Sequence, residues 1–393
     1  MGNSATGIKE FLKWEESNKE KPENYDLKRN MQRYYEDYKE NVKAKLGETR
    51  YKRLMKNMPY KIEGRSNIEE WLTYKTTDIK GTGKRFDCDN SNTTCELTRK
   101  IYEVLWDWGK KDRASQPLRA FDDKEFGGDT MNSLGTTFNA YMKIIVSEPG
   151  AMSAPKIVDM FSKHGVTYWA KEMGNKFWFL WNKFARNTHC IGNFVLVPYY
   201  FNGYRNGLTK DYWDLSLVLL RDKKENDTWK FLGRYPVNWV KEDFKKYINL
   251  FFLWDYVDCE GEAIEPKSLF TRKENEKLPQ KNIDFEEFLE NVNERIERRS
   301  RFMVAMLRIA DTESKYKYRG EHQEEWRNWS VSGIYKLFMD KVFLKDEVYV
   351  NGYSEVIGQM SDLVDKEIPG KEGGEIHNIL ENIKKELGKN EAS

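Results

Sequence analysis

The sequence predicts a mainly α-helical protein with a small β element, that is, an α+β fold in which a multi-helix body carries one short sheet or hairpin in its middle segment. Apolar residues recur at helical spacing over much of the 393-residue chain. In the middle segment only one stretch, Asn193–Tyr200, has the pattern of a strand, and Pro198 places it at an edge or an end of a sheet. Aromatic residues make up 14% of the chain, so they can build a core although only 39% of the residues are hydrophobic.

Residues 1–84 are predicted to form an N-terminal helical region. Apolar residues recur at helical spacing between Asp26 and Gly47, and Pro22 separates this helix from a shorter one before it. One side of the longer helix carries the tyrosines Tyr34, Tyr35 and Tyr38. These rings either stack on nucleic-acid bases or pack against the body of the protein, and the second interpretation is favoured.

Residues 85–260 are predicted to form a central domain. Thr93 and Glu96 form a capping box at the start of a first helix. Gly127–Thr130 is expected to be a loop that leads into a second helix. The remaining predicted elements of this region are a helix over Ser153–Lys163, the strand over Asn193–Tyr200, and core helices over Tyr212–Arg221 and Trp239–Val257.

Residues 281–393 are predicted to form a C-terminal helical region. Asp284 and Glu287 indicate the start of a long helix that runs through Ile309. Val342–Val350 is compatible with a small hairpin, and the apolar residues from Ile376 to Leu387 predict an amphipathic terminal helix.

The long helix carries the only basic run that bears on function. Its members are Arg295, Arg298, Arg299 and Arg301. They either contact phosphates or form a solvated face that pairs with the preceding glutamates, and the solvated face is favoured.

Composition and motifs exclude several classes of protein. The net charge is only +2, so the strong basic footprint of a dedicated nucleic-acid binder is missing. The first thirty residues show no signal-peptide pattern, and the longest apolar run, Tyr247–Val257, is too short to span a bilayer. The four cysteines show no CxxC pair and are expected to be reduced thiols. We therefore expect a cytoplasmic protein that does not associate with a membrane.

The motifs of common nucleotide and metal sites are also missing from the sequence. There is no GxxxxGK[ST] loop, no GxGxxG after a strand, no HExxH and no His/Cys set at zinc spacing. We therefore predict no metal site and no resident cofactor. Mg²⁺ is still compatible with the sequence, because Asp129 and Asp214 could bind it.

The candidate site lies around Arg186–Arg221, where polar residues follow one another closely beside an apolar run. Arg205 is predicted to hold an anion, because its guanidinium offers a planar fork to phosphate or carboxylate. Asp129 and Asp214 would orient Arg205 or a metal. The predicted lining of the pocket is Asp129, Thr130, His189, Asn193, Asn202, Arg205 and Asp214.

The same residues have a purely structural interpretation. Arg205 and Asp214 would then satisfy each other in a buried network, and Asn193 and Asn202 would serve as turn residues. His189 is expected to be buried and hydrogen-bonded. If the chain is catalytic, His189 and Asp214 are the candidates, although burial would have to raise the pKa of a carboxylate before it could act as a base at neutral pH.

An ordered set of short motifs between residues 86 and 258 resembles an uncharacterised bacterial domain family. The motifs include Cys190-Ile191-Gly192 with Val197-Pro198, Asn202-Gly203-Tyr204-Arg205, and Asp211 to Leu217. Phe86-Asp87, Leu105-Trp106, Gly128-Asp129-Thr130 and Phe251 to Val257 complete the set. The resemblance implies no particular activity. Gly128 stands where that family has a serine, so a role of that hydroxyl is not carried over.

A shorter segment is similar to the HNH-type nuclease half of GmrSD-like restriction systems. The similarity rests on Gly192 to Val197 followed by Asn202, with His189 just before. It implies water activation beside a divalent metal by a histidine on an upstream strand. This chain has no histidine before His164 and no His-x-x-Pro element there, so the base of that family is missing.

Two classes of function are compatible with these observations. The first is a protein that binds a phosphate-bearing or other anionic ligand, including nucleic acid, in a pocket of the central domain, with a degenerate nuclease-like site. The second is a non-enzymatic helical interaction protein whose terminal helices contact a protein partner. Exposure of Arg205 and of Asp129 or Asp214 in a concave pocket favours the first class, and full burial favours the second.

Overall fold

The structure is a computed structural model of the chain, and it is mainly helical with small two-stranded sheets, as the sequence predicts. The residues that the structure describes are 8–9, 11–13, 21–25, 27, 96–106, 126–134, 137–138, 140–141, 144, 171–198, 201, 205, 212–222, 229–231, 235–237, 241–260, 263–273, 278–313, 333–344, 352–368 and 370–388.

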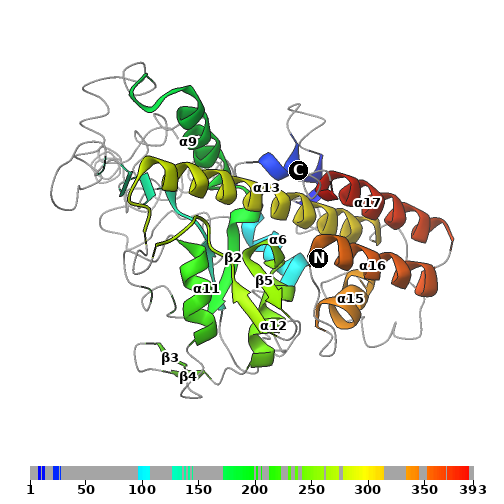
Figure 1. Cartoon of the computed structure of the whole chain (residues 1–393). Helices are drawn as coiled ribbons and strands as arrows, with labels where there is room; N and C mark the ends of the chain where they lie inside the picture. The colour runs from blue at the N-terminus through cyan, green and yellow to red at the C-terminus, as the bar shows by residue number, and fades with distance from the viewer. Residues whose placement is uncertain are drawn as a thin grey trace, which may run out of the picture.

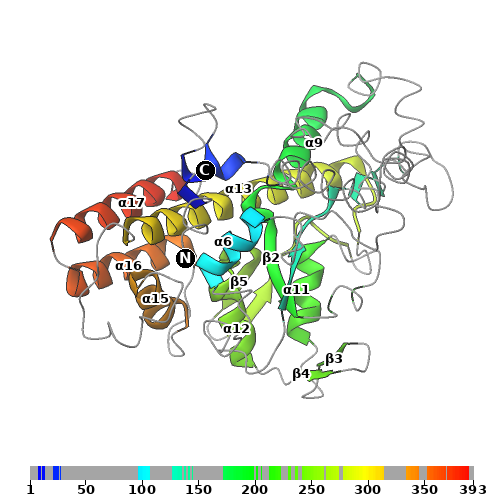
Figure 2. The ribbon, with the colours of Figure 1, turned by 180° about the vertical axis from the view of Figure 1, so that it is seen from behind.

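Helix α13 (Asn282–Glu313) is the central element of the fold (Figure 1). Helix α9 (Asn175–Asn187) packs near its N-terminal end, and α17 (Lys371–Gly388) lies beside its C-terminal part. The view from behind shows the same arrangement, with α9 at one end of α13 and the C-terminal helices at the other (Figure 2). α13 therefore connects two hydrophobic clusters, one that includes Phe285 and Phe288 and one that includes Phe302 and Met306.

The start of α13 is set by a side chain that the sequence indicated. The Asp284 carboxylate accepts the backbone N–H groups of Gln280 and Lys281 at 2.9 and 3.0 Å. These donors lack partners within the helix, so the carboxylate stabilises the first turn. Glu287 instead accepts the backbone N–H of Thr271 at 2.9 Å and so fixes the segment that precedes the helix.

The middle of the molecule contains the strand pair β1 (Phe126–Thr130) and β2 (Phe194–Pro198), which is antiparallel. The prediction of a strand near Asn193–Tyr200 is confirmed for β2. The prediction of a loop over Gly127–Thr130 is wrong, because these residues belong to β1. All five residues of β2 are buried, so their backbone N–H and C=O groups need hydrogen-bond partners within the protein. Pairing with β1, which contains two glycines, provides such partners.

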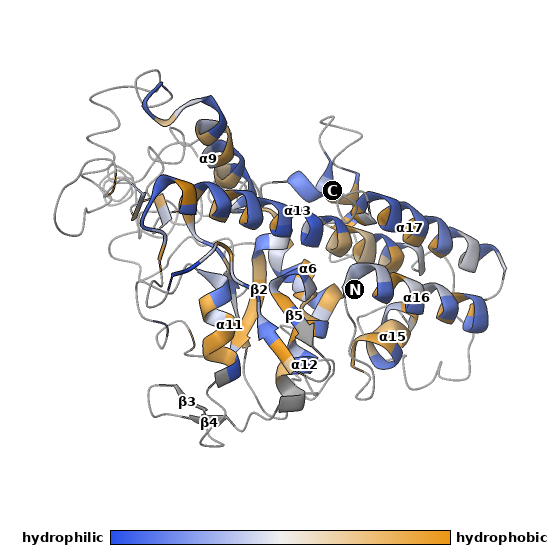
Figure 3. Ribbon diagram, viewed as in Figure 1, coloured by the Kyte–Doolittle hydropathy of each residue, from blue (hydrophilic) through white to orange (hydrophobic). Residues whose placement is uncertain are grey.

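Helices lie beside this strand pair in both views (Figures 1 and 2). They are α6 (Glu96–Trp106), α11 (Trp213–Asp222) and α12 (Lys241–Leu250). Figure 3 shows mostly hydrophobic residues along β2 and α11, whereas α13, α16 (Tyr353–Glu367) and α17 also carry many hydrophilic ones. The helix predicted over Tyr212–Arg221 is confirmed as α11, and its charged residues lie in its first and last turns.

The helix predicted over Trp239–Val257 ends early, at Leu250. Phe252 adopts a left-handed conformation with φ 56°, and Leu253 N donates to Ile248 O at 2.9 Å. This is the hydrogen-bond pattern of a helix C-terminus at which glycine is usual. The chain continues through η5 (Trp254–Tyr256) into β5 (Val257–Glu260), which pairs with β6 (Ala263–Pro266). The apolar run Tyr247–Val257 continues through this turn without a break, so the turn was not predicted from the sequence.

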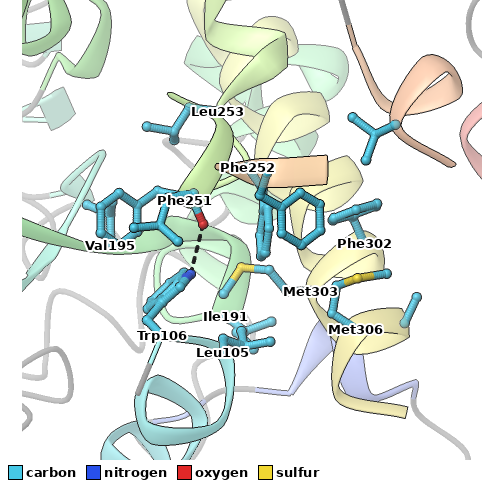
Figure 4. Close-up of a cluster of buried hydrophobic side chains, with 14 of the residues drawn as sticks. Leu105, Trp106, Ile191, Val195, Phe251, Phe252, Leu253, Phe302, Met303 and Met306 are labelled. Carbon is cyan, nitrogen blue, oxygen red and sulfur yellow. Dashed lines mark hydrogen bonds between the residues drawn. The ribbon is translucent and has the colours of Figure 1, made fainter. Parts of the chain in front are cut away.

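The aromatic side chains of this turn form part of the core (Figure 4). The rings of Phe251 and Trp106 lie 5.0 Å apart, and those of Phe252 and Phe302 lie 5.1 Å apart. Trp106 Nε1 donates to the Leu250 carbonyl oxygen at 2.9 Å, so α6 caps the end of α12. The left-handed conformation is by itself unfavourable for phenylalanine. Burial of these rings stabilises it at Phe252.

The remaining elements complete the C-terminal layer and the edges. α15 (Gly333–Phe338) leads into the π-helix η6 (Met339–Phe343), so the predicted hairpin over Val342–Val350 is wrong for its first two residues. The structure describes none of residues 345–350. A small pair, β3 (Trp229–Phe231) and β4 (Tyr235–Val237), was not predicted. The amphipathic terminal helix is confirmed as α17, with Ile376, Leu380 and Leu387 buried.

Several predictions concern residues that the structure does not describe. They are the helix between Asp26 and Gly47 with its tyrosines (apart from Leu27), the helix over Ser153–Lys163, and Asn202. Within the described part of the chain, every helix is too short or too polar to cross a membrane.

Candidate functional site

The predicted site residues come from three elements that meet beside α13. Asp129 is on β1, Asn193 ends the short helix η3 (Ile191–Asn193), and Asp214 is in the first turn of α11. Arg205 lies between β2 and α11. The structure therefore brings together residues that are far apart in the sequence.

Arg205 forms a buried ion pair with Asp129. Its Nη1 also donates to Ser216 Oγ at 3.0 Å. The guanidinium lies over the rings of Phe201 and Trp213, at 5.1 and 5.5 Å from their centroids. The Arg205 side chain is 0% exposed. Its charge is thus compensated inside the fold, where an uncompensated guanidinium would be very unfavourable.

Asp214 forms its ion pair with Arg272, not with Arg205. The same carboxylate accepts the backbone N–H of Leu269 at 3.0 Å, and Asp214 is 2% exposed. The Arg272 guanidinium stacks on the ring of Phe270 at 4.4 Å. The pairing of Arg205 with Asp214 proposed from the sequence is wrong, because each residue has its own partner of opposite charge.

Asn193 is fully buried and its amide group is used within the protein. Its Oδ1 accepts the backbone N–H of Asn132 at 3.0 Å. Its Nδ2 donates to the carbonyl oxygens of Asn132 and Thr188, at 2.9 and 2.8 Å. Asn132 in turn accepts the backbone N–H of Trp213 at 3.4 Å, at the start of α11. Sequence analysis missed Asn132, whose only signal was its place just after the Asp129-Thr130 pair.

The other predicted residues lie around this network. His189 is buried, as expected, and its carbonyl oxygen accepts the backbone N–H of Leu27 at 3.1 Å. Thr130 is half-buried and pairs in the sheet with Phe194. Asn202 lies outside the described residues.

The arginines of α13 are the largest correction to the sequence analysis. A solvated, ion-paired face was predicted, but Arg295, Arg298 and Arg299 are 5%, 6% and 0% exposed. Arg299 donates to the carbonyl oxygens of Gly192 and Phe194, at 2.7 Å each, and of Phe251 at 2.8 Å. Burial lowers the pKa of Arg299. This one side chain therefore connects η3, β2 and the end of α12.

Arg298 makes a similar connection to the C-terminal layer, and Arg295 makes one to the segment that follows β6. Arg298 binds Asp255 at 2.8 Å and the carbonyl oxygen of Leu387, at the end of α17, at 2.8 Å. Burial raises the pKa of Asp255, and the charge of Arg298 opposes this effect. Arg295 donates to the carbonyl oxygen of Ser268 at 2.9 Å and lies over the ring of Tyr256. Burial raises the pKa of Tyr256 to about 12.

Gly192 allows α13 to approach η3 closely. Its N–H donates to Ser300 Oγ at 2.8 Å. A Cβ atom at this position would lie 2.5 Å from the backbone nitrogen of Ser300, and also too close to the carbonyl oxygen of Ile296. No side chain fits there. The glycine of the Cys190-Ile191-Gly192 motif thus has a packing role.

In the part of the chain that the structure describes, no three His, Cys, Asp or Glu side chains are grouped so that they could hold a metal ion. The charged groups of this region are instead arranged as pairs and as arginine–carbonyl contacts. Such an arrangement can orient helices and strands. It defines a mainly helical protein with a polar, buried junction between its central elements and α13.

Comparisons of the chain with models of protein families, with curated proteins and with solved structures find no match. The resemblances to the bacterial domain family and to the HNH-type nucleases therefore stay predictions.

Proposed function

We propose that this chain is a non-enzymatic helical interaction protein. In this proposal the central polar residues stabilise the fold, and the terminal helices present the surface for a protein partner. One observation carries the proposal. Arg205, Asp129 and Asp214 are 3%, 6% and 2% exposed, and each is bound within the protein.

Burial of this kind is costly for a ligand site. A ligand that used the Arg205 fork would have to displace Asp129, and one that used Asp214 would have to displace Arg272. Removing one partner of a buried pair leaves the other charge uncompensated and costs about 3–5 kcal/mol. The central residues are therefore better suited to hold elements together than to exchange partners with a ligand.

The surface of the C-terminal helices is a suitable place for a partner. α16 and α17 pack on each other and α17 packs on α13, and α17 also carries exposed residues. Its exposed residues include acidic and basic side chains, among them Glu381 and Lys384 on α17. Such mixed charges provide specificity for a complementary partner more than affinity.

The test compares two charge swaps that leave the net charge unchanged. Glu381→Lys with Lys384→Glu alters the exposed face of α17. Lys171→Glu with Glu172→Lys, at exposed positions before α9, is the matched control. Tagged wild-type protein and both variants are purified from the cells that naturally contain the protein, and co-purifying proteins are quantified by mass spectrometry.

We expect one specific partner to be retained by the wild type and the control swap and to be lost from the α17 swap. Equal recovery with all three proteins would count against the terminal helices. Binding or cleavage of single-stranded or plasmid DNA by the purified wild-type protein, with or without Mg²⁺, would instead support the anion-binding, nuclease-like alternative.

A further inference from the structure

A surface pocket of about 170 Å³ lies away from the central junction, between α13, α17 and the short helix η1 (Pro22–Asn24). Figures 1 and 2 both show α17 alongside α13 here. The lining residues are Lys21, Glu23, Arg301, Val304, Ala305, Arg308, Ile379, Asn382, Ile383 and Glu386. Pockets for drug-sized ligands measure roughly 300–1,000 Å³, so this one fits a smaller molecule.

The pocket has an apolar floor and a polar rim. Val304, Ala305 and Ile383 are buried and supply the floor. Asn382 is exposed and offers an amide at the rim. Convergence of a few polar groups on an apolar floor is the usual composition of a small-molecule site.

The charges in the pocket are unevenly compensated. Lys21 lies 3.9 Å from Glu23 and 3.5 Å from Glu386, so the two carboxylates share one cation. Within the described part of the chain, neither Arg301 nor Arg308 forms an ion pair or a side-chain hydrogen bond. This distinguishes them from Arg298, which binds Asp255 on the same helix.

Arg301 and Arg308 also share one face of α13. They are seven residues apart, which is two helical turns, or about 10 Å along the axis. Val304 and Ala305 lie between them in the sequence and on the pocket floor. Two guanidinium groups thus flank a short apolar surface, on the part of the lining that α13 provides.

We infer that this pocket binds a small molecule with two anionic groups, carboxylate or phosphate, joined by a short linker. Each guanidinium offers planar donors to one anionic group. The linker contacts Val304 and Ala305. Glu23 and Glu386 repel anions from the Lys21 side, so the ligand lies along α13. The inference does not depend on a protein partner for α17.

The experiment measures binding to the full chain by isothermal titration calorimetry with five probes. Glutarate and pyrophosphate carry two anionic groups, and they separate carboxylate from phosphate recognition. Butyrate and inorganic phosphate are the single-group controls. γ-Aminobutyrate replaces one anion of glutarate by a cation. The variants are Arg301→Gln, Arg308→Gln and their combination, with Lys384→Gln, at an exposed position of α17 outside the pocket lining, as the matched loss of charge.

We expect one of the two dianions to bind at a single site about tenfold more tightly than the single-group probes, because it gains a second charge-assisted contact. Each arginine variant should weaken that binding about tenfold, and Lys384→Gln should change it by less than about twofold. Circular dichroism melting confirms that the variants are folded. No saturable binding of either dianion, unchanged binding to the double variant, or tighter binding of γ-aminobutyrate would overturn the inference.

Discussion

Replacing Gly192 by alanine tests whether α13 depends on close contact with η3. The added Cβ would lie 2.5 Å from the backbone nitrogen of Ser300 and closer still to the carbonyl oxygen of Ile296, where ordinary contacts begin at 3.4 Å, so α13 has to move by at least about 0.9 Å or the turn has to distort. Overpacking of this kind costs about 1–3 kcal/mol. The Cβ atom would also collide with Ser300 Oγ, and displacing this oxygen breaks its hydrogen bond from Gly192 N, which adds about 0.5–1.5 kcal/mol. We expect the free energy of unfolding to fall by about 2–4 kcal/mol.

Urea unfolding followed by tryptophan fluorescence and far-UV circular dichroism measures this change, as a lower midpoint at an unchanged slope. Gly374→Ala is the matched control. Gly374 is exposed within α17, and a Cβ atom added to it would have no neighbouring atom within 4 Å. There the same substitution should stabilise the protein by about 0.5–1 kcal/mol, because alanine favours a helix over glycine.

The opposite signs of these two glycine substitutions are the critical result. A Gly192→Ala protein within about 0.5 kcal/mol of the wild type would refute the close packing of α13 on η3. It would also remove the packing explanation for the Cys190-Ile191-Gly192 motif.

Three further predictions concern the buried charges and tyrosines. Arg299→Met should lower the free energy of unfolding by about 3 kcal/mol, since three buried carbonyl oxygens lose a charged donor, and Arg299→Lys should lower it less; equal stability of the methionine variant in urea would contradict the role of Arg299. A double-mutant cycle of Asp129→Asn and Arg205→Met should give a coupling energy of about 2 kcal/mol, and a value near zero would show that the two residues do not act as a pair. Burial raises the pKa of five tyrosines above the ordinary value. Their contribution to the free energy of unfolding is therefore fully present below about pH 10. It is lost as the pH rises towards the pKa values of the folded protein, where the pKa of Tyr256 is about 12. Tyrosinate absorbance at pH 11 should therefore be lower in the native protein than in denaturant, and equal absorbance would refute this burial. These tyrosines are Tyr141, Tyr247, Tyr256, Tyr335 and Tyr353.

Local patterns were sufficient to predict the fold class and the strongly periodic elements. α11 and α17 have apolar residues at helical spacing, and β2 is a short apolar run that ends in proline, so each was found within a few residues. The turn at Phe252 was missed because a left-handed phenylalanine gives no local signal. Its conformation is stabilised by rings from other elements, among them Trp106 and Phe302.

The partners of the candidate site residues could not be predicted. Asp129 and Arg205 are 76 residues apart, and Asp214 and Leu269 are 55 apart. Sequence spacing identifies neighbours only within one helix or one strand. The sequence could therefore indicate that polar residues lie near β2, but not which of them form pairs. The choice of Asp214 as the partner of Arg205 rested only on their proximity in the sequence.

The arginines of α13 show what separates a structural charge from one that is available to a ligand. A buried ion pair and an anion site use the same residue types, so the sequence alone cannot distinguish them. The distinction lies in whether each cation already has an acceptor within the fold. Arg298 binds Asp255, and Arg299 binds three carbonyl oxygens. Arg301 lies on the pocket beside α17 and has no such acceptor among the described residues. Along a single helix, the arginines therefore change from holding the core together to lining the surface pocket for which a dianionic ligand is proposed.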